Sequence, residues 1–120
     1  MKVLVIAAHG SRKKESNIEV EKLAVRLAKK IGNRFDKVVH AFLQIAEPLL
    51  ETTMTEWVKE GATHMVIFPF FIGSGSHILE DIPNLVEKAK QANPHVEFTL
   101  TRQLGKIEAI EDVIINEVIS

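Results

Sequence analysis

The stretch VLVIAA at residues 3–8 runs directly into HGSR at residues 9–12. Six consecutive apolar residues that end at a glycine-containing polar turn are typical of a strand buried on both faces. Strands of this kind occur in parallel sheets that helices cover on both sides, because an open face would leave half of the side chains in water. The stretch therefore predicts a central strand of an α/β sheet, with the polar turn at its carboxyl end.

Apolar runs and amphipathic segments alternate along the rest of the chain. Further strands are predicted at residues 38–43, 65–71 and 96–101. Apolar residues at helical spacing, and glycines that can end a helix, predict helices at residues 18–31, 48–60, 81–92 and 107–118. We expect the third helix to begin at Asp81, as its N-cap, just ahead of Pro83.

This alternation of strands and helices predicts one α/β domain over residues 1–120, with a four-stranded parallel sheet and helices on both faces. Right-handed crossovers then favour the strand order 2-1-3-4. In that order the chain changes direction between the first and third strands, and ligands of such sheets bind outside the carboxyl ends at this switch point. The residues that follow these two strands are therefore the first candidates for a site.

The composition excludes several classes of function. The 15 Lys and Arg residues nearly balance the 16 Asp and Glu residues, which is not the charge of a nucleic-acid-binding domain. The chain has no cysteine, so disulfides, zinc ribbons, iron–sulfur clusters and thiol catalysis are ruled out, and any metal must have nitrogen and oxygen ligands. The longest apolar run, residues 65–72, is far shorter than the roughly 20 residues of a membrane helix. We expect a cytoplasmic protein with no membrane partner.

Two histidines follow the strands that flank the predicted switch point. His9 comes directly after the first strand, and His77 comes after the third strand and the loop GSGS at residues 73–76. Imidazole can hold divalent cobalt, nickel or iron without thiolates, and it can accept protons near neutral pH. Either histidine alone could be a hydrogen-bonded loop residue, but their shared position raises the hypothesis of a metal site.

The other three histidines are useful controls for this hypothesis. His40 lies inside the second predicted strand, His64 lies at the opposite end of the third, and His95 follows Pro94 in a connection. None of these positions is at the carboxyl ends of the strands. We therefore expect structural or surface roles for all three.

Several segments carry a more specific pattern, and they are VIAAHGSR at residues 5–12, AFLQIAEP at 41–48, GATHMVIFP at 61–69, HILEDIP at 77–83 and QLG at 103–105. In this order they resemble the class II chelatases, the small sirohydrochlorin chelatase family, and they span nearly the whole chain. The segment at residues 77–83 is similar to the H-x-x-x-D-I-P signature of that family. Each segment alone is a weak pattern, but together they make a strong one.

The resemblance implies a single chelatase-type domain that inserts a divalent metal ion into sirohydrochlorin or a close relative, in cobalamin- or sirohaem-type tetrapyrrole biosynthesis. Cobalt is the expected metal, with iron or nickel used by some members, and no organic cofactor is needed. Longer members have two such domains across a cleft. A chain of 120 residues resembles the short form, which pairs as a homodimer. By the resemblance, His9 and His77 are the catalytic and metal-binding residues.

One residue departs from the family pattern. Many members have Glu where this chain has Gln44, so Gln44 is a third metal-ligand candidate that has an amide oxygen in place of a charged carboxylate.

The predicted tetrapyrrole pocket comprises Ser11, Arg12, Gly75 and Ser76. Arg12 and the two lysines after it could attract the carboxylates around the tetrapyrrole, although a solvated first turn of helix explains them equally well. The glycine-rich segment lacks the Lys-Ser/Thr ending of a phosphate-binding P-loop, so we interpret it as a wall of the ring pocket.

Two other functions remain as alternatives. A His-Gly pair after a first strand also occurs in histidine phosphatases, but these have Arg-His-Gly, and Ala8 stands where the phosphate-binding arginine would be. The second alternative is a non-catalytic carrier of metal or tetrapyrrole with the same fold. The residues do not separate a carrier from a chelatase, because both need a metal with open coordination positions.

Overall fold

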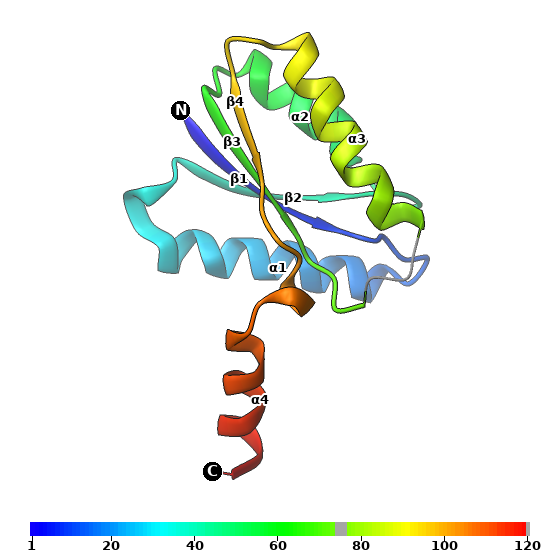
Figure 1. The fold of residues 1–120 in the computed structure, drawn as a ribbon, viewed down its shortest axis with the longest axis vertical. Helices are drawn as coiled ribbons and strands as arrows, with labels where there is room; N and C mark the ends of the chain where they lie inside the picture. Colours follow the sequence, from blue (N-terminus) through cyan, green and yellow to red (C-terminus); the bar gives the residue numbers. More distant parts are fainter. Residues whose placement is uncertain (74–76, 120) are drawn as a thin grey trace.

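The structure is a computed structural model that describes residues 1–73 and 77–119, and for residues 77–79 it describes the backbone alone. Within these residues, four strands form one parallel sheet in the order β2-β1-β3-β4, which confirms the predicted topology (Figure 1). The strands are β1 (Lys2–Ala8), β2 (Lys37–Phe42), β3 (His64–Pro69) and β4 (Glu97–Leu100). The α-helices are α1 (Lys14–Ile31), α2 (Leu50–Lys59), α3 (His77–Ala92) and α4 (Ala109–Ile119), and short 3₁₀ turns are η1 (Gly32–Arg34) and η2 (Leu104–Lys106).

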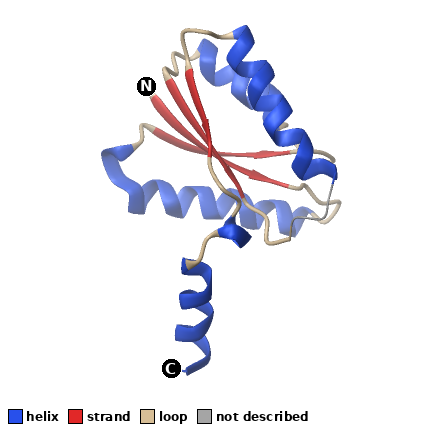
Figure 2. Ribbon diagram, in the orientation of Figure 1, coloured by secondary structure: helices blue, strands red, loops and turns tan. Residues whose placement is uncertain are grey.

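Helices α2 and α3 cover one face of the sheet and α1 covers the other (Figures 1 and 2). The larger core lies between the sheet and α2 with α3. Its largest fully buried side chains include Leu50, Met65, Ile67 and Ile82. Burial of one such side chain contributes about 1.5–3 kcal/mol, so this face supplies most of the stabilisation of the fold.

The carboxyl ends of β1, β2 and β3 lie side by side at one edge of the sheet. Ala7 pairs in register with Ala41 of β2 and with Pro69 of β3, so these three strands end side by side. The backbone N–H of Leu43 donates to Ala8 O at 3.0 Å, and that of Phe70 donates to Ala7 O at 2.8 Å. The three segments that follow these strands therefore meet at one edge, which is the predicted switch point.

The start of the third helix differs from the prediction. Helix α3 begins at His77, four residues before Asp81, so Asp81 is not the N-cap and Pro83 lies inside the helix. A proline removes one helical hydrogen bond and usually marks a first turn. Here Ile82 and Val86, one turn apart, are both buried in the core, and this packing holds the helix across the proline.

The last helix leaves the domain and projects from it (Figure 1). None of its residues is buried. The prediction of a helix in this segment is confirmed, but this helix covers neither face of the sheet. In the portion of the chain that is described, no helix is both long enough and apolar enough to cross a bilayer.

Candidate active site

His9 is the first residue after β1. The glycine that follows it allows this loop to pass close to the loop after β2. Gly10 has a φ of +94°, and a Cβ at this position would overlap the carbonyl oxygen of Gln44. The backbone N–H of Gln44 donates to His9 O at 3.2 Å. The loops that follow β1 and β2 are therefore in direct backbone contact, and only glycine fits at this contact.

Asn17 on α1 holds the next residue of the His9 loop through both ends of its side-chain amide. The Ser11 N–H donates to Asn17 Oδ1 at 2.9 Å, and Asn17 Nδ2 donates to Ser11 O at 2.8 Å. The hydroxyl oxygen of Ser11 also accepts from the Lys13 N–H at 3.0 Å. Each such bond contributes about 0.5–1.5 kcal/mol, so Asn17 ties the loop firmly to α1. No pattern in the sequence pointed to Asn17.

The His9 ring rests on an aromatic residue that follows β3. Its centroid is 5.2 Å from that of Phe71, and the two ring planes are inclined by 69°. Phe71 is buried whereas His9 is exposed, so one side of the imidazole packs on the core and the other faces solvent. An exposed imidazole on a fixed support can bind a metal ion and leave coordination positions open for a second ligand.

His77 is the first residue of α3, at the end of the segment that begins with Phe71. His77 follows β3, and β3 pairs with β1, the strand that ends just before His9. The two histidines therefore follow neighbouring parallel strands, as the predicted strand order requires. The side chain of His77, and both Gly75 and Ser76, lie outside the described residues. Arg12 lies on the exposed surface of the loop before α1.

The segment between β3 and α3 is held from the other side by residues that follow β4. Gln103 Nε2 donates to Gly73 O at 3.0 Å and to Ile72 O at 3.3 Å. The Gly105 N–H donates to Phe71 O at 2.8 Å, and a Cβ on Gly105 would overlap Ile72 O. In the sequence Gln103 and Gly105 stand only as part of the QLG segment, and no pattern there indicates that they hold this loop.

Gln44 is exposed and borders a surface cavity of about 300 Å³. The cavity lies between the end of β2 and α3, and the α3 residues around it are Asp81, Asn84, Leu85 and Lys88. Gln44 is thus hydrogen-bonded to His9 through the backbone, and it lines the same cavity as Asp81. Among the described side chains, no three His, Asp or Glu residues converge as a ready-made metal cluster, and this set does not include His77.

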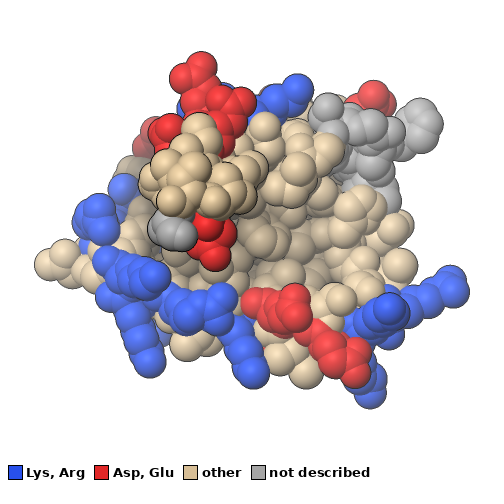
Figure 3. Space-filling view, turned by 90° about the horizontal axis from the view of Figure 1, so that it is seen from below, with Lys and Arg blue, Asp and Glu red and all other residues tan. Residues whose placement is uncertain are grey.

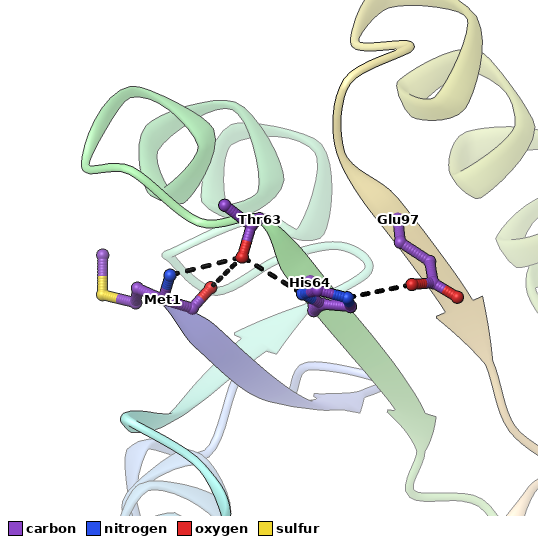
Figure 4. Close-up of polar contacts among 4 residues, drawn as sticks. All are labelled: Met1, Thr63, His64 and Glu97. Atoms are coloured by element: carbon purple, nitrogen blue, oxygen red, sulfur yellow. Dashed lines mark hydrogen bonds and ion pairs between the residues drawn. The ribbon is translucent and has the colours of Figure 1, made fainter.

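The three control histidines lie away from the carboxyl edge. His40 is half-buried on β2 with its ring edge-on to Phe42 at 5.5 Å. His95 is exposed in the connection before β4. His64 starts β3 at the opposite edge, where its Nε2 is 3.0 Å from a Glu97 carboxylate oxygen and its Nδ1 is 3.1 Å from the hydroxyl of Thr63 (Figure 4).

Comparison with known proteins gives one family. The family model described as CbiX matches residues 3–120. The chloroplastic sirohydrochlorin ferrochelatase of Arabidopsis thaliana is 32% identical over 92% of this chain and 48% of its own length. The sirohydrochlorin cobaltochelatase of Sulfolobus acidocaldarius is 25% identical over 92% of this chain and 85% of its own length.

This chain therefore spans about half the length of the Arabidopsis relative and most of the length of the archaeal one. Among solved structures, a CbiX protein from Marinobacter aquaeolei VT8 superimposes with a TM-score of 0.73, at 25% identity over 98% of each chain. The family match covers the strands, the helices and the loops that hold His9 and His77. This chain belongs to the CbiX family.

Proposed function

We propose that this protein is a chelatase that inserts a divalent metal ion into sirohydrochlorin or a close relative. The observation that carries the proposal is the His9 imidazole, exposed at the carboxyl edge and supported by Phe71 on the segment that leads to His77. Two further findings support this choice of reaction. The chain belongs to the CbiX family, and its plant and archaeal relatives are named sirohydrochlorin ferrochelatase and sirohydrochlorin cobaltochelatase.

The chemistry of metal insertion suits these residue types. Insertion removes two pyrrole protons as the metal replaces them, so the site needs groups that hold the ion weakly and groups that accept protons. Neutral imidazole does both, and a site with few protein ligands lets the ring nitrogens complete the coordination. In this proposal His9 and His77 hold the incoming ion, and Gln44 is a weak third ligand.

The metal is a substrate of this reaction, and we propose cobalt, with iron or nickel as alternatives. Relatives are named for both cobalt and iron, so the family match does not separate them. Imidazole and amide ligands accept all three ions, and the affinity order for divalent metals favours nickel and cobalt over iron. Competition between the metals, in one assay with limiting sirohydrochlorin, would decide the preference.

We propose that the tetrapyrrole enters beside the His9 loop. Arg12 is exposed there and could attract a rim carboxylate, while Ser11, Gly75 and Ser76 would line the pocket. We also propose a cytoplasmic homodimer whose cleft lies between two subunits and which uses no organic cofactor, nucleic acid or membrane. The Arabidopsis relative is about twice as long as this chain, and this length supports the arrangement. One copy of this chain would then correspond to half of the longer protein and would supply half of a site between two domains.

A turnover measurement tests the proposal against the carrier alternative. Trace protein is added to excess sirohydrochlorin and cobalt, and the visible spectrum of the ring is followed. A chelatase converts many equivalents of ring per protein and obeys saturation in both substrates. A spectral change that stops at one equivalent would mean that the protein is a carrier, and the proposed activity would be wrong.

A further inference from the structure

Ile45, directly after Gln44, has a backbone conformation that β-branched residues rarely adopt. Its φ is +71°, and in the part of the chain that the structure describes no other residue except glycine has a positive φ. The Ala46 N–H donates to Gln44 O at 2.8 Å, which closes a three-residue turn around Ile45. Such turns with a positive φ are rare and strained, above all for a branched side chain. Holding Ile45 there costs folding free energy, and strain of this kind occurs mostly at functional sites.

The side chain that this turn carries is apolar and exposed to water. Ile45 is 58% exposed, and Ile72, on the segment after β3, is 66% exposed. Single exposed apolar residues are common on protein surfaces, so exposure alone indicates nothing. Position sets these two isoleucines apart, because each directly follows a residue that contacts His9. Those residues are Gln44, through its backbone, and Phe71, through its ring.

The sheet places the two isoleucines on opposite sides of the His9 loop. Strand β1 lies between β2 and β3, and its residue Ala7 is in register with Ala41 and Pro69. The loop of Ile45 follows β2, and the loop of Ile72 follows β3. The loop that starts at His9 therefore lies between two loops that each carry an exposed isoleucine.

A glycine contact fixes the backbone at both isoleucines. A Cβ on Gly10 would overlap Gln44 O, and a Cβ on Gly105 would overlap Ile72 O. Gln103 Nε2 also donates to Ile72 O at 3.3 Å. Backbone segments that are packed this closely cannot move to bury the two side chains without breaking these contacts. The exposure of the isoleucines is therefore built into this edge of the sheet.

The charge around these loops suits an apolar part of a ligand. Residues 42–49 have no Lys or Arg, and residues 70–76 have no charged residue. Basic residues follow β1 instead, where Arg12, Lys13 and Lys14 are all exposed. Figure 3 shows groups of Lys and Arg that border a broad surface with little charge. A ligand with both carboxylates and an apolar face would place its carboxylates toward the basic segment and its apolar face toward the isoleucines.

We propose that Ile45 and Ile72 contact the apolar face of the tetrapyrrole, one on each side of His9. This inference rests on the proposed function and names two further residues that position its substrate. The ring is flat, rich in carbon on both faces and much wider than an imidazole. When one face lies over His9 to receive the metal, that face also covers the residues on either side of His9. The contact removes both side chains from water, which is favourable and offsets the strain at Ile45.

Fluorescence titration of metal-free sirohydrochlorin, with no metal present, tests the two residues directly. Ile45→Ser and Ile72→Ser should each raise the Kd for the ring about tenfold, since burial of most of an isoleucine side chain changes an equilibrium by about that factor. The Kd for cobalt, measured by calorimetry, should stay at the wild-type value because neither side chain has a metal-binding atom. Val25→Ser, which removes a branched side chain that is 54% exposed on α1, is the matched control and should change neither constant.

The strain at residue 45 provides a second readout. Ile45→Gly removes both the strain and the side chain. It should therefore unfold at a urea concentration equal to or above that of the wild type, and yet bind the ring about tenfold more weakly. A fall in stability together with the loss of ring affinity would mean that Ile45 serves the fold, and would overturn its assignment as a ring contact.

The outcomes separate this inference from the proposed function. Wild-type ring affinity in either serine variant would overturn the contact at that residue, while insertion at the wild-type rate would leave the chelatase standing. Weaker ring binding by the variants of a protein that inserts no metal would support the contact and overturn the chelatase. A wild-type protein that does not bind the ring would overturn both. Sedimentation without ring should give one oligomeric state for wild type and variants, and a shift toward monomer in the variants would assign the isoleucines to a subunit contact and overturn the inference.

Discussion

The imidazole of His9 lies edge-on against the ring of Phe71, with centroids 5.2 Å apart and planes inclined by 69°. This contact joins the residue after β1 to the segment after β3, although the two are far apart in the sequence. Phe71 is buried and is further held through its carbonyl by Gly105. The metal-binding side chain of the proposed site therefore stands on a rigid support.

Replacing the support should reduce metal insertion more than it reduces stability. Phe71→Leu keeps an apolar side chain but removes the ring contact, worth about 0.5–1.5 kcal/mol. We expect the rate of cobalt insertion to fall on the order of tenfold, because the imidazole loses its fixed orientation. Phe98→Leu, in the same core but on β4, is the matched control and should lose similar stability with a rate near wild type. Equal rates for the two variants would contradict a role of Phe71 in positioning His9.

Gly10→Ala should distort the site because its Cβ would overlap the Gln44 carbonyl at a φ of +94°. The backbone strain alone costs about 1–3 kcal/mol, and the two loops must also separate. We expect insertion activity to be largely lost in protein that still folds. Gly32→Ala is the control, since its φ is +63° and nothing lies within 4 Å of the added Cβ. With a ψ of −141° it should lose about 1–3 kcal/mol by chemical denaturation, from backbone strain alone, and keep its activity.

Asn17→Ala removes both hydrogen bonds that hold Ser11 to α1. At about 0.5–1.5 kcal/mol per bond, the loss should lower the free energy of unfolding by about 1–3 kcal/mol and loosen the His9 loop. We expect a several-fold lower insertion rate, measured together with urea denaturation. Asn33→Ala, exposed on η1, should change neither quantity. A normal rate in Asn17→Ala would show that the loop keeps its shape without this clamp.

The strand order and the positions of the two histidine-bearing segments could be predicted from the sequence, because continuous apolar strands and right-handed crossovers leave few topologies. The start of α3 could not be predicted from the sequence. Pro83 is a common first-turn residue, and only the burial of Ile82 and Val86 shows that the helix continues through it.

The supporting residues of the site were not predictable for a related reason. Asn17 and Gln103 act on backbone atoms of other segments, six and about thirty positions away. Such contacts follow no periodicity and depend on how the loops meet in space. The projection of α4 from the domain could not be predicted either. An apolar helical pattern predicts a helix, but it does not indicate whether that helix packs on its own sheet or on that of another chain.

Gln44→Glu should tighten cobalt binding, since it restores a carboxylate at a position beside the His9 loop. A charged oxygen is a stronger ligand for a divalent ion than an amide oxygen, so calorimetric titration should show a lower Kd. Gln91→Glu makes the same charge change on an exposed part of α3 and controls for net charge. If both variants bind cobalt as the wild type does, Gln44 points away from the metal and is not a ligand.

The central claim is that His9 and His77 carry out metal insertion, and the initial rate of cobalt insertion into sirohydrochlorin tests it most directly. Under saturating substrates, His9→Ala and His77→Ala should each lower this rate at least about a hundredfold, the usual contribution of a positioned proton acceptor. Their circular dichroism should match wild type, because His9 is exposed and His77 only begins α3. His64→Ala, at the opposite edge of the sheet, should keep the wild-type rate. A folded His9→Ala or His77→Ala protein that inserts cobalt as fast as His64→Ala would contradict the claim.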